Sequence, residues 1–333
     1  MHFTKWQRGE NRHSAKGQFA MRLITQEKDR LGFIGIGYMG QPIARRLLES
    51  GFKLTVYDRE RKKAEDLIRF GGAVAQSVSR LSSACNIVLS CLPSDEAVLD
   101  IYTGADGVFA HAHPGSVVID MSTVSPETSR ELWRLGSKRG IEVLDVTISG
   151  STPTAENGLL TLFGGGSKER FDSAESIFRV IAKKYFYLGP SGSGATMKLV
   201  VNTLLGIGMQ AIAEAVALGE KAGLDRHRLL DVLAQTAVVA PAHLGKLERA
   251  MKNDYTPQFP IRLMNKDFGL ILSLAASLGA RMPAAGAAFE INARQSEEGA
   301  EQDFSAVILQ MEKRAHLGSP DKGPLESVSF FEK

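Results

Sequence analysis

The chain has 333 residues, of which 44% are hydrophobic and 23% are charged, and these globular averages exclude a disordered, collagenous or coiled-coil protein. Residues 1–30 carry seven basic and three acidic side chains, whereas the whole chain has a net charge of only +3, so the rest of the chain is nearly neutral and offers no basic surface to nucleic acid. Only two cysteines occur, Cys85 and Cys91, which excludes a disulfide scaffold and favours a reducing, cytoplasmic location.

Residues 1–30 are expected to lie outside the fold. They lack the apolar core of a secretory signal and have no convincing amphipathic run for an organelle address, so a disordered arm, or a start at Met21, is the favoured interpretation. No membrane span is expected either. The longest apolar run, 199–213, is interrupted by Asn202 and Gln210 and is shorter than the about 20 residues that cross a bilayer.

Between residues 31 and 193, short strand-like runs alternate with helical patterns. Strands are expected at 31–36, 53–57, 86–92, 116–119, 141–144, 159–163 and 185–188. Helices are expected at 41–50, 61–70 and 126–139. This alternation is typical of βαβ units and predicts a mostly parallel sheet.

The pattern changes beyond residue 193, where only helices are expected. Residues 195–222 predict one helix about 40 Å long that is apolar on nearly every face and therefore buried on all sides. Further helices are expected at 226–236, 243–252, 264–279, 284–298 and 305–315. We therefore divide the chain into an arm at 1–30, an α/β domain at 31–193, an all-α domain at 194–316 and a loose tail at 317–333. Because a helix that is apolar all round needs partners on every side, a homodimer or homotetramer is expected through the helical domain.

A glycine-rich loop follows the first expected strand and opens the first expected helix. Its sequence, GIGYMG at 35–40, has the form G-x-G-x-x-G. In this position the first glycine permits a tight turn, the second lets the backbone approach a pyrophosphate, and the third allows close helix–strand packing. The phosphate then lies against the N-terminus of the helix. The loop predicts a Rossmann-type doubly wound sheet with dinucleotide contacts at Gly35, Ile36, Gly37, Tyr38, Met39 and Gly40.

The adenosine end of the cofactor is expected at the end of the second strand. Tyr57 and Asp58 lie there, and a carboxylate at this point accepts the ribose hydroxyls of NAD and repels a 2′-phosphate. The structural alternative is that Asp58 caps the next helix. Arg59 and the basic residues at 61–63 would tolerate a 2′-phosphate. NAD is therefore favoured, and NADP stays open.

Several motifs follow one another along residues 31 to about 315 in the order found in a known family. They are the glycine loop already described, Leu92-Pro93, DMSTVSP at 120–126, DVTISGS at 145–151, GSGATMKLVVN at 192–202 and Lys266-Asp267. The chain resembles the β-hydroxyacid dehydrogenase family, whose members include 3-hydroxyisobutyrate dehydrogenase and tartronate semialdehyde reductase.

The resemblance implies that Lys198 is the general acid and base. In that role it takes the proton of the substrate hydroxyl while a hydride passes to the nicotinamide, and it returns the proton in the reverse direction. Lys198 lies one turn into the long helix and shares a face with Asn202, four residues on. The nearby helix N-terminus and partial burial lower its pKa. A surface lysine is the poorer interpretation, because residues 199–213 contain no other charge.

The same resemblance assigns the other contacts of the site. Substrate contacts fall on Ser122, Ser149, Gly150, Ser151, Asn202 and Lys266. Contacts at the nicotinamide end fall on Leu92, Pro93, Thr123, Lys266 and Asp267. Taken alone, Ser149-Gly150 would be an ordinary turn, and Lys266 could be a surface lysine paired with Asp267. Thr147 and Ser151 stand where the family has Pro and Gly, which is expected to shrink or repolarise the substrate pocket.

The expected function is oxidation of a small β-hydroxy acid such as 3-hydroxyisobutyrate to its semialdehyde, or the reverse reduction. Reduction of tartronate semialdehyde, oxidation of a sugar acid such as threonate, and a non-catalytic NAD(P)-binding sensor stay open. An imine reductase is disfavoured because those relatives usually lack the lysine at 198, and a 6-phosphogluconate dehydrogenase because its helical domain is much longer. No metal site is expected, since His111 and His113 have no accompanying ligand cluster. Cys91 is expected to be a buried strand residue.

Overall fold

An eight-stranded sheet occupies the N-terminal half of the computed structural model, which describes residues 23–294 and 297–317. Its strands are β1 (Arg30–Ile34), β2 (Lys53–Tyr57), β3 (Ala73–Val74), β4 (Ile87–Ser90), β5 (Val117–Asp120), β6 (Glu142–Ser149), β7 (Leu160–Gly165) and β8 (Ala182–Tyr187). The spatial order is β3-β2-β1-β4-β5-β6-β7-β8, and every pair is parallel except β6–β7. The order reverses between β1 and β4, which creates a crevice at the carboxyl ends of these two strands.

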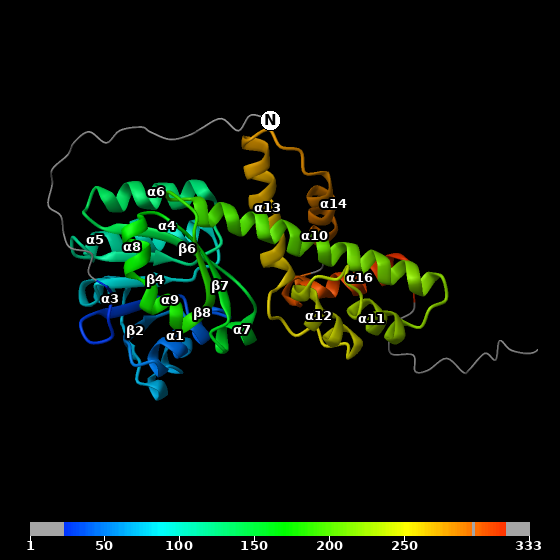
Figure 1. Cartoon of the computed structure of the whole chain (residues 1–333), viewed down its shortest axis with the longest axis horizontal. Helices are drawn as coiled ribbons and strands as arrows, with labels where there is room; N and C mark the ends of the chain where they lie inside the picture. Colours follow the sequence, from blue (N-terminus) through cyan, green and yellow to red (C-terminus); the bar gives the residue numbers. More distant parts are fainter. Residues whose placement is uncertain (1–22, 295–296, 318–333) are drawn as a thin grey trace, which may run out of the picture.

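Helices cover both faces of this sheet (Figure 1). They are α1 (Gly40–Glu49), α2 (Arg61–Glu65), η1 (Ile68–Phe70), α3 (Val78–Ala84), α4 (Asp95–Thr103), α5 (Val108–His111), α6 (Pro126–Ser137), α7 (Thr152–Glu156), α8 (Lys168–Ser173) and α9 (Glu175–Ile181). Successive strand side chains point to opposite faces, so Phe33 belongs to the buried cluster that contains Ile43 of α1, whereas Ile34 belongs to the cluster that contains Leu132 of α6. The result confirms the expected Rossmann-type doubly wound sheet.

The C-terminal half is helical and is built around one long helix, α10 (Ser193–Lys221). The other helices are α11 (Arg226–Ala234), α12 (Pro241–Met251), α13 (Ile261–Ser277), α14 (Pro283–Ala293), α15 (Glu297–Glu301), η2 (Phe304–Ala306) and α16 (Val307–Arg314). Figure 1 shows α10 running from the sheet into the helical half, with α13 crossing it. By length and composition α10 could cross a membrane, and 44% of its most apolar window is buried inside the structure; the core helix of a globular protein has the same features.

The expectation that α10 is buried on all sides is wrong for the single chain. Val200, Leu204 and Leu218 are 52%, 72% and 72% exposed. Composition alone showed that the helix is apolar all round, but not which of its faces the chain itself covers. The sequence also missed β3 and the short helices α3, α4, α5, α7, α8 and α9. Residues 284–298, expected as one helix, fall in two: α14 ends at Ala293 and α15 begins at Glu297.

The N-terminal boundary of the fold lies earlier than residue 31. Ile24 is buried, its N–H donates to the carbonyl of Ser173 at 2.9 Å, and its own carbonyl accepts the Ser176 hydroxyl at 2.7 Å. Ile24, assigned to the arm from the sequence, is therefore packed against α8 and α9, and Asp29 accepts the side-chain amide of Asn86 at 2.6 Å. The rest of the expected arm, 1–22, and the expected tail from 318 onward lie outside the described residues.

Candidate active site

The glycine loop lies at the crevice between β1 and β4, and the space around the missing Cβ differs from one glycine to the next. Gly35 has φ +93°, and a Cβ on it would lie 2.3 Å from the carbonyl oxygen of Cys91. A Cβ on Gly40 would lie 1.9 Å from the carbonyl oxygen of Gly35, whereas a Cβ on Gly37 would meet nothing within 4 Å. Gly35 and Gly40 are thus required by the protein's own packing. The open space at Gly37, beside the N-terminus of α1, fits the pyrophosphate of a dinucleotide.

The carboxylate of Asp58 supports this loop from the end of β2. It accepts the N–H of Ile36 at 2.7 Å through one oxygen and the N–H of Glu60, just before α2, at 2.8 Å through the other. Asp58 therefore fixes the start of the next helical segment, as the structural alternative expected. It still has lone pairs, and its contact with ribose hydroxyls stays a prediction. Arg59 is exposed beside it.

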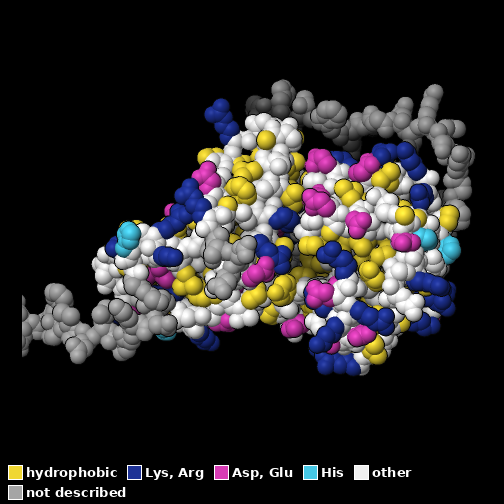
Figure 2. Space-filling model, turned by 180° about the vertical axis from the view of Figure 1, so that it is seen from behind, with side chains coloured by type: hydrophobic (Ala, Val, Ile, Leu, Met, Phe, Trp, Pro, Cys, Tyr) yellow, Lys and Arg dark blue, Asp and Glu magenta, His cyan; other side chains and the backbone are white. Residues whose placement is uncertain are grey.

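A cavity of about 750 Å³ lies between the sheet and the helical half. From behind, the molecule is hollowed between its two halves, and hydrophobic side chains gather there (Figure 2). Thirteen of the predicted site residues line the cavity: Tyr38, Met39, Leu92, Pro93, Ser122, Thr123, Ser149, Gly150, Ser151, Lys198, Asn202, Lys266 and Asp267. Gly35, Ile36, Gly37, Gly40, Tyr57, Asp58 and Arg59 are not part of its lining, since they form the crevice and its β2 side.

Lys198 projects from the second turn of α10 into this cavity. Among the described residues it has no hydrogen-bond or ion-pair partner. Burial lowers its pKa from 10.5 to about 8; the nearby carboxylate of Asp267 opposes this shift, and the ammonium of Lys266 adds to it. A lysine in this state exchanges a proton readily near neutral pH, which is what a general acid and base requires.

A short polar chain joins the helices around Lys198 to the sheet. The amide nitrogen of Asn202 donates to Asp267 at 2.5 Å, and Asp267 forms an ion pair with Lys266 at 2.8 Å. Lys266 also donates to the carbonyl of Thr123, in the loop after β5. Lys266 thus pairs with its neighbour, as the structural alternative expected, and also reaches across to the α/β half; its contact with substrate or cofactor stays a prediction. The Asn202 oxygen is buried and has no hydrogen-bond partner among the described residues.

The loop at 149–151 ends β6 on the opposite side of the cavity. Gly150 has φ +147°, and a Cβ on it would lie 2.4 Å from the Thr154 hydroxyl. That hydroxyl accepts the N–H of Ser151 at 2.7 Å and so holds the start of α7 against the loop. The Ser149 hydroxyl makes no hydrogen bond to any described residue, which leaves it available to a carboxylate or hydroxyl of a ligand.

Comparison with known proteins agrees with this geometry. A family model described as the NAD binding domain of 6-phosphogluconate dehydrogenase matches residues 30–189, and one described as NAD-binding of NADP-dependent 3-hydroxyisobutyrate dehydrogenase matches 192–311. Glyoxylate/succinic semialdehyde reductase 1 of Arabidopsis thaliana is 36% identical over 279 residues, which cover 84% of this chain and 96% of that protein. The chain belongs to the β-hydroxyacid dehydrogenase family.

Two further relatives of this dehydrogenase widen the comparison. The 2-(hydroxymethyl)glutarate dehydrogenase of Eubacterium barkeri is 31% identical over 84% of this chain and 93% of its own length. The solved structure of a Mycobacterium tuberculosis 3-hydroxyisobutyrate dehydrogenase with L-serine has a TM-score of 0.74 at 31% identity, covering 85% of this chain and 99% of that one. This chain is accordingly an NAD(P)-dependent oxidoreductase that acts on the hydroxyl group of hydroxy acids.

In the dehydrogenase, the structure bears on three expectations about individual side chains. The Ser122 hydroxyl donates to Asp120 at 2.6 Å and accepts the N–H of Leu92 at 2.8 Å, so it holds the cavity wall together; the residue lines the cavity, and its contact with substrate stays a prediction. Thr147 is buried in β6 outside the cavity, and its hydroxyl donates to the carbonyl of Gly194 at 2.8 Å. It therefore ties the sheet to α10 and does not repolarise the pocket.

Cys91, expected inside a strand, lies just beyond β4 and lines the cavity. Burial raises the pKa of its thiol to about 12, so the thiol stays protonated and is not a nucleophile.

Part of the cavity wall was not predicted from the sequence. It is formed by α12, the segment before α13, and η2, through His243, Lys246, Arg249, Gln258, Phe259 and Phe304.

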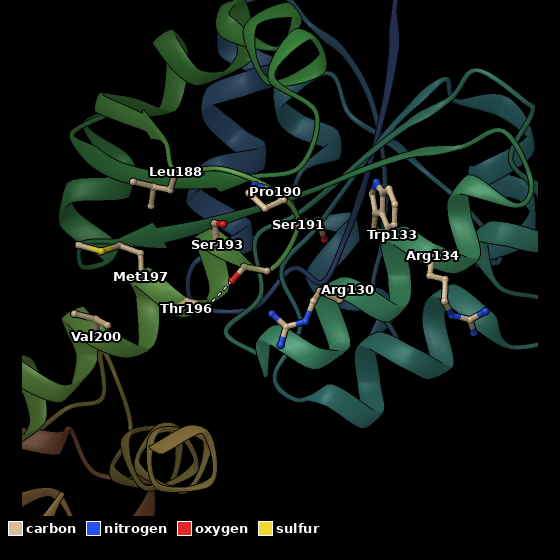
Figure 3. A pocket seen from close by; sticks show the side chains of 11 residues that line it. Arg130, Trp133, Arg134, Leu188, Pro190, Ser191, Ser193, Thr196, Met197 and Val200 are labelled. Carbon is tan, nitrogen blue, oxygen red and sulfur yellow. Dashed lines mark hydrogen bonds between the residues drawn. The ribbon is translucent and has the colours of Figure 1, made fainter. Parts of the chain in front are cut away.

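A second concavity of this dehydrogenase, about 740 Å³ in volume, lies on the surface where α6 meets the connection from β8 into α10 (Figure 3). Trp133, Leu188 and Val200 make much of its lining apolar. Its two arginines, Arg130 and Arg134, are each paired with a glutamate of α6. No predicted site residue lies in it, so the chemistry belongs to the cavity that contains Lys198.

Proposed function

We propose that this dehydrogenase interconverts a small β-hydroxy acid, of the 3-hydroxyisobutyrate type, and its semialdehyde. The observation that carries the proposal is the unpaired ammonium of Lys198, whose pKa is lowered to about 8, in the cavity that Leu92, Pro93 and Thr123 also line. NAD(P), bound along the glycine loop, supplies the hydride acceptor or donor. Lys198 takes the proton of the substrate hydroxyl in the oxidation and returns it to the alkoxide oxygen in the reduction.

Other residues of the cavity orient the substrate in this proposal. The free Ser149 hydroxyl and the backbone of Gly150 receive the carboxylate. The Asn202 amide nitrogen, which donates one of its hydrogens to Asp267, donates the other to the oxygen of the hydroxyl that reacts, so the hydroxyl proton stays available to Lys198. The ion pair of Lys266 with Asp267 closes the site from the helical half. With the hydroxyl between Lys198 and Asn202 and the carboxylate at the loop, the reacting carbon is held against the nicotinamide end.

The test is a panel of hydroxy acids assayed with NAD and with NADP. It contains 3-hydroxyisobutyrate, glycerate, 3-hydroxypropionate, 4-hydroxybutyrate and threonate, with glyoxylate and succinic semialdehyde in the reductive direction. The expected result is turnover of one acid that Lys198→Ala loses while still binding cofactor. If the enzyme binds the cofactor but turns over no compound of the panel, the result would favour the non-catalytic sensor. A preference for glyoxylate would favour the activity named in the Arabidopsis relative.

Two further expectations belong with this proposal. The carboxylate of Asp58 favours NAD over NADP. The exposed apolar side chains of α10, among them Val200 and Leu204, favour a homodimer or homotetramer that covers them. A monomeric mass by light scattering at micromolar concentration would refute the second expectation. The cytoplasmic location expected from the cysteine content stays a prediction.

A further inference from the structure

The face of β6 that turns toward α10 carries three polar side chains. They are Asp145, Thr147 and Ser149, which alternate along the strand and therefore share one face, while the residues between them belong to the apolar cluster on the other face. Ser149, at the end of the strand, lines the cavity that contains Lys198. Asp145 and Thr147 lie further back on the same face, outside the cavity lining and against the first turn of α10.

The start of α10 is capped by Asp145 rather than by a side chain of its own. The N-cap residue is Gly192, which has φ +90° and offers no side-chain acceptor, so the first N–H groups of the helix need an acceptor from elsewhere. One oxygen of Asp145 accepts the N–H of Gly192 at 2.9 Å, and the other accepts that of Ala195 at 3.0 Å. Burial raises the pKa of this carboxyl to about 6, against the effect of these N–H donors, so it is ionised at neutral pH.

Thr147 holds the carbonyl to which the backbone of Lys198 is bonded. Its hydroxyl donates to the Gly194 carbonyl at 2.8 Å, whereas the Phe163 carbonyl lies further away at 3.4 Å. In an α-helix the N–H of each residue donates to the carbonyl four residues earlier, so the Gly194 carbonyl also accepts the N–H of Lys198. A continuous chain of hydrogen bonds therefore leads from the Thr147 hydroxyl to the backbone of Lys198.

Two glycines allow the helix to approach the strand this closely. A Cβ on Gly194 would lie 2.4 Å from the carbonyl oxygens of Asp145 and Phe163. A Cβ on Gly165 of β7 would lie 2.6 Å from a carboxylate oxygen of Asp145. The first turn of α10 is thus in direct contact with the backbone of β6 and β7, and it has little room to shift.

We propose that Asp145 and Thr147, the β6 clamp, are positioning residues that fix the backbone of Lys198 relative to Ser149 and so set the geometry of proton transfer. The inference rests on the proposed function, which takes Lys198 as the acid and base and Ser149 as a substrate contact. One strand then holds both the substrate and the lysine. Because a displacement of about 1 Å at a reacting group can cost about 10²-fold in rate, loss of the clamp should slow turnover more than it weakens binding.

The first test is Thr147→Val, which removes the hydroxyl and keeps a branched side chain of similar size. With 3-hydroxyisobutyrate, or the acid of the panel that wild type prefers, kcat should fall about fivefold, as for the loss of one hydrogen bond, with KM and NAD affinity unchanged. Thr147→Ser keeps the hydroxyl and should restore most of kcat. The matched control is Thr203→Val. Thr203 donates to the Leu199 carbonyl at 2.9 Å, so this variant loses the same type of bond in α10 but none to β6, and its kcat should equal that of wild type.

A double-mutant cycle separates positioning from stability. If Thr147 acts through Lys198, Thr147→Val should cost about fivefold in the wild-type background and nothing on the residual turnover of Lys198→Ala. A variant that only destabilises the fold would lose the same factor in both backgrounds. Asp145→Asn keeps one acceptor and turns an NH₂ group toward the other N–H, so it should lower kcat about tenfold or more, again only where Lys198 is present. The stoichiometry of NAD binding gives the folded fraction to which each kcat is referred.

Amide hydrogen exchange tests the clamp without turnover. Residues 194–198 should exchange about fivefold faster in Thr147→Val than in wild type, and at the wild-type rate in Thr203→Val. A wild-type kcat in Thr147→Val, or an equal loss in both backgrounds of the cycle, would overturn the inference and leave the proposed function standing. Faster exchange in Thr147→Val, in an enzyme that turns over no hydroxy acid, would refute the proposed function and support the clamp. Unchanged exchange would refute the clamp itself.

Discussion

The lowered pKa of Lys198 makes the pH dependence of the two reaction directions the sharpest prediction. At pH 7 a lysine with a pKa of about 8 is about 10% neutral, whereas one at 10.5 is about 0.03% neutral. Burial in the cavity therefore raises the amount of free base about 300-fold, which corresponds to about 3 kcal/mol. The neutral amine is the base in oxidation, and the ammonium is the acid in reduction.

The two directions must therefore respond to pH with opposite sign. The kcat/KM for oxidation should rise about tenfold per pH unit below pH 8 and level off above it, while that for reduction should stay level below 8 and fall above it. The assay is the initial rate of NADH formation or consumption across this range. Lys198→Arg, which keeps the charge but cannot release a proton near neutral pH, should lose about 10²–10⁴-fold in oxidation and still bind NAD.

A variant next to Lys198 checks the assignment independently of the absolute rate. The Asp267 carboxylate raises the pKa of Lys198 against the effect of burial, so Asp267→Asn should move the break in the oxidation profile to lower pH, by about one unit. The loss of the hydrogen bond to Asn202 lowers the rate but not the position of the break. A break at the same pH in Asp267→Asn, or equal slopes in both directions, would refute Lys198 as the titrating group.

Three further outcomes follow from contacts elsewhere. Gly37→Ala should leave the melting temperature unchanged and should weaken NAD binding, as measured by fluorescence titration. Gly40→Ala should lower the melting temperature, because only this variant places a Cβ against a backbone oxygen. Equal melting temperatures for the two variants would contradict this. Lys246→Met should cost about 3–5 kcal/mol in urea unfolding, because it leaves Asp303 buried without its cation, and a loss below about 1 kcal/mol would show that the pair is not desolvated. Asp58→Asn should shift the kcat/KM ratio of NAD to NADP toward NADP, and an unchanged ratio would mean that Asp58 only holds the loop.

The parts of the fold that the sequence predicted well have local causes. The strand at 53–57 was predicted with the bounds of β2, because turn-forming residues flank a short strand-like run there. The start of α6 was predicted at Pro126, where Ser125 accepts the N–H of Thr128 as the N-cap. The glycine loop was recognisable because its spacing and its place between strand and helix are both recorded in the sequence.

The parts that the sequence missed depend on contacts between distant residues. Nothing near Ser122 shows that its hydroxyl is already bonded to Leu92, thirty residues earlier. Gln258 acquires its orientation only from Lys246 and so from the packing of α12 against the segment before α13. Such side-chain pairings are tertiary facts, and residue type and periodicity do not encode them.

The arrangement around Lys198 also explains why closure between the two halves matters to the chemistry. Asp267 and Lys266 act on the pKa of Lys198 in opposite directions, and they form an ion pair with each other. Desolvation is the largest contribution to the shift. The bond from Lys266 to Thr123 joins α13 to the loop after β5, beside the cavity in which Lys198 is desolvated. A neutral ligand that fills the cavity should therefore lower the pKa of Lys198 further, whereas an anionic one should raise it.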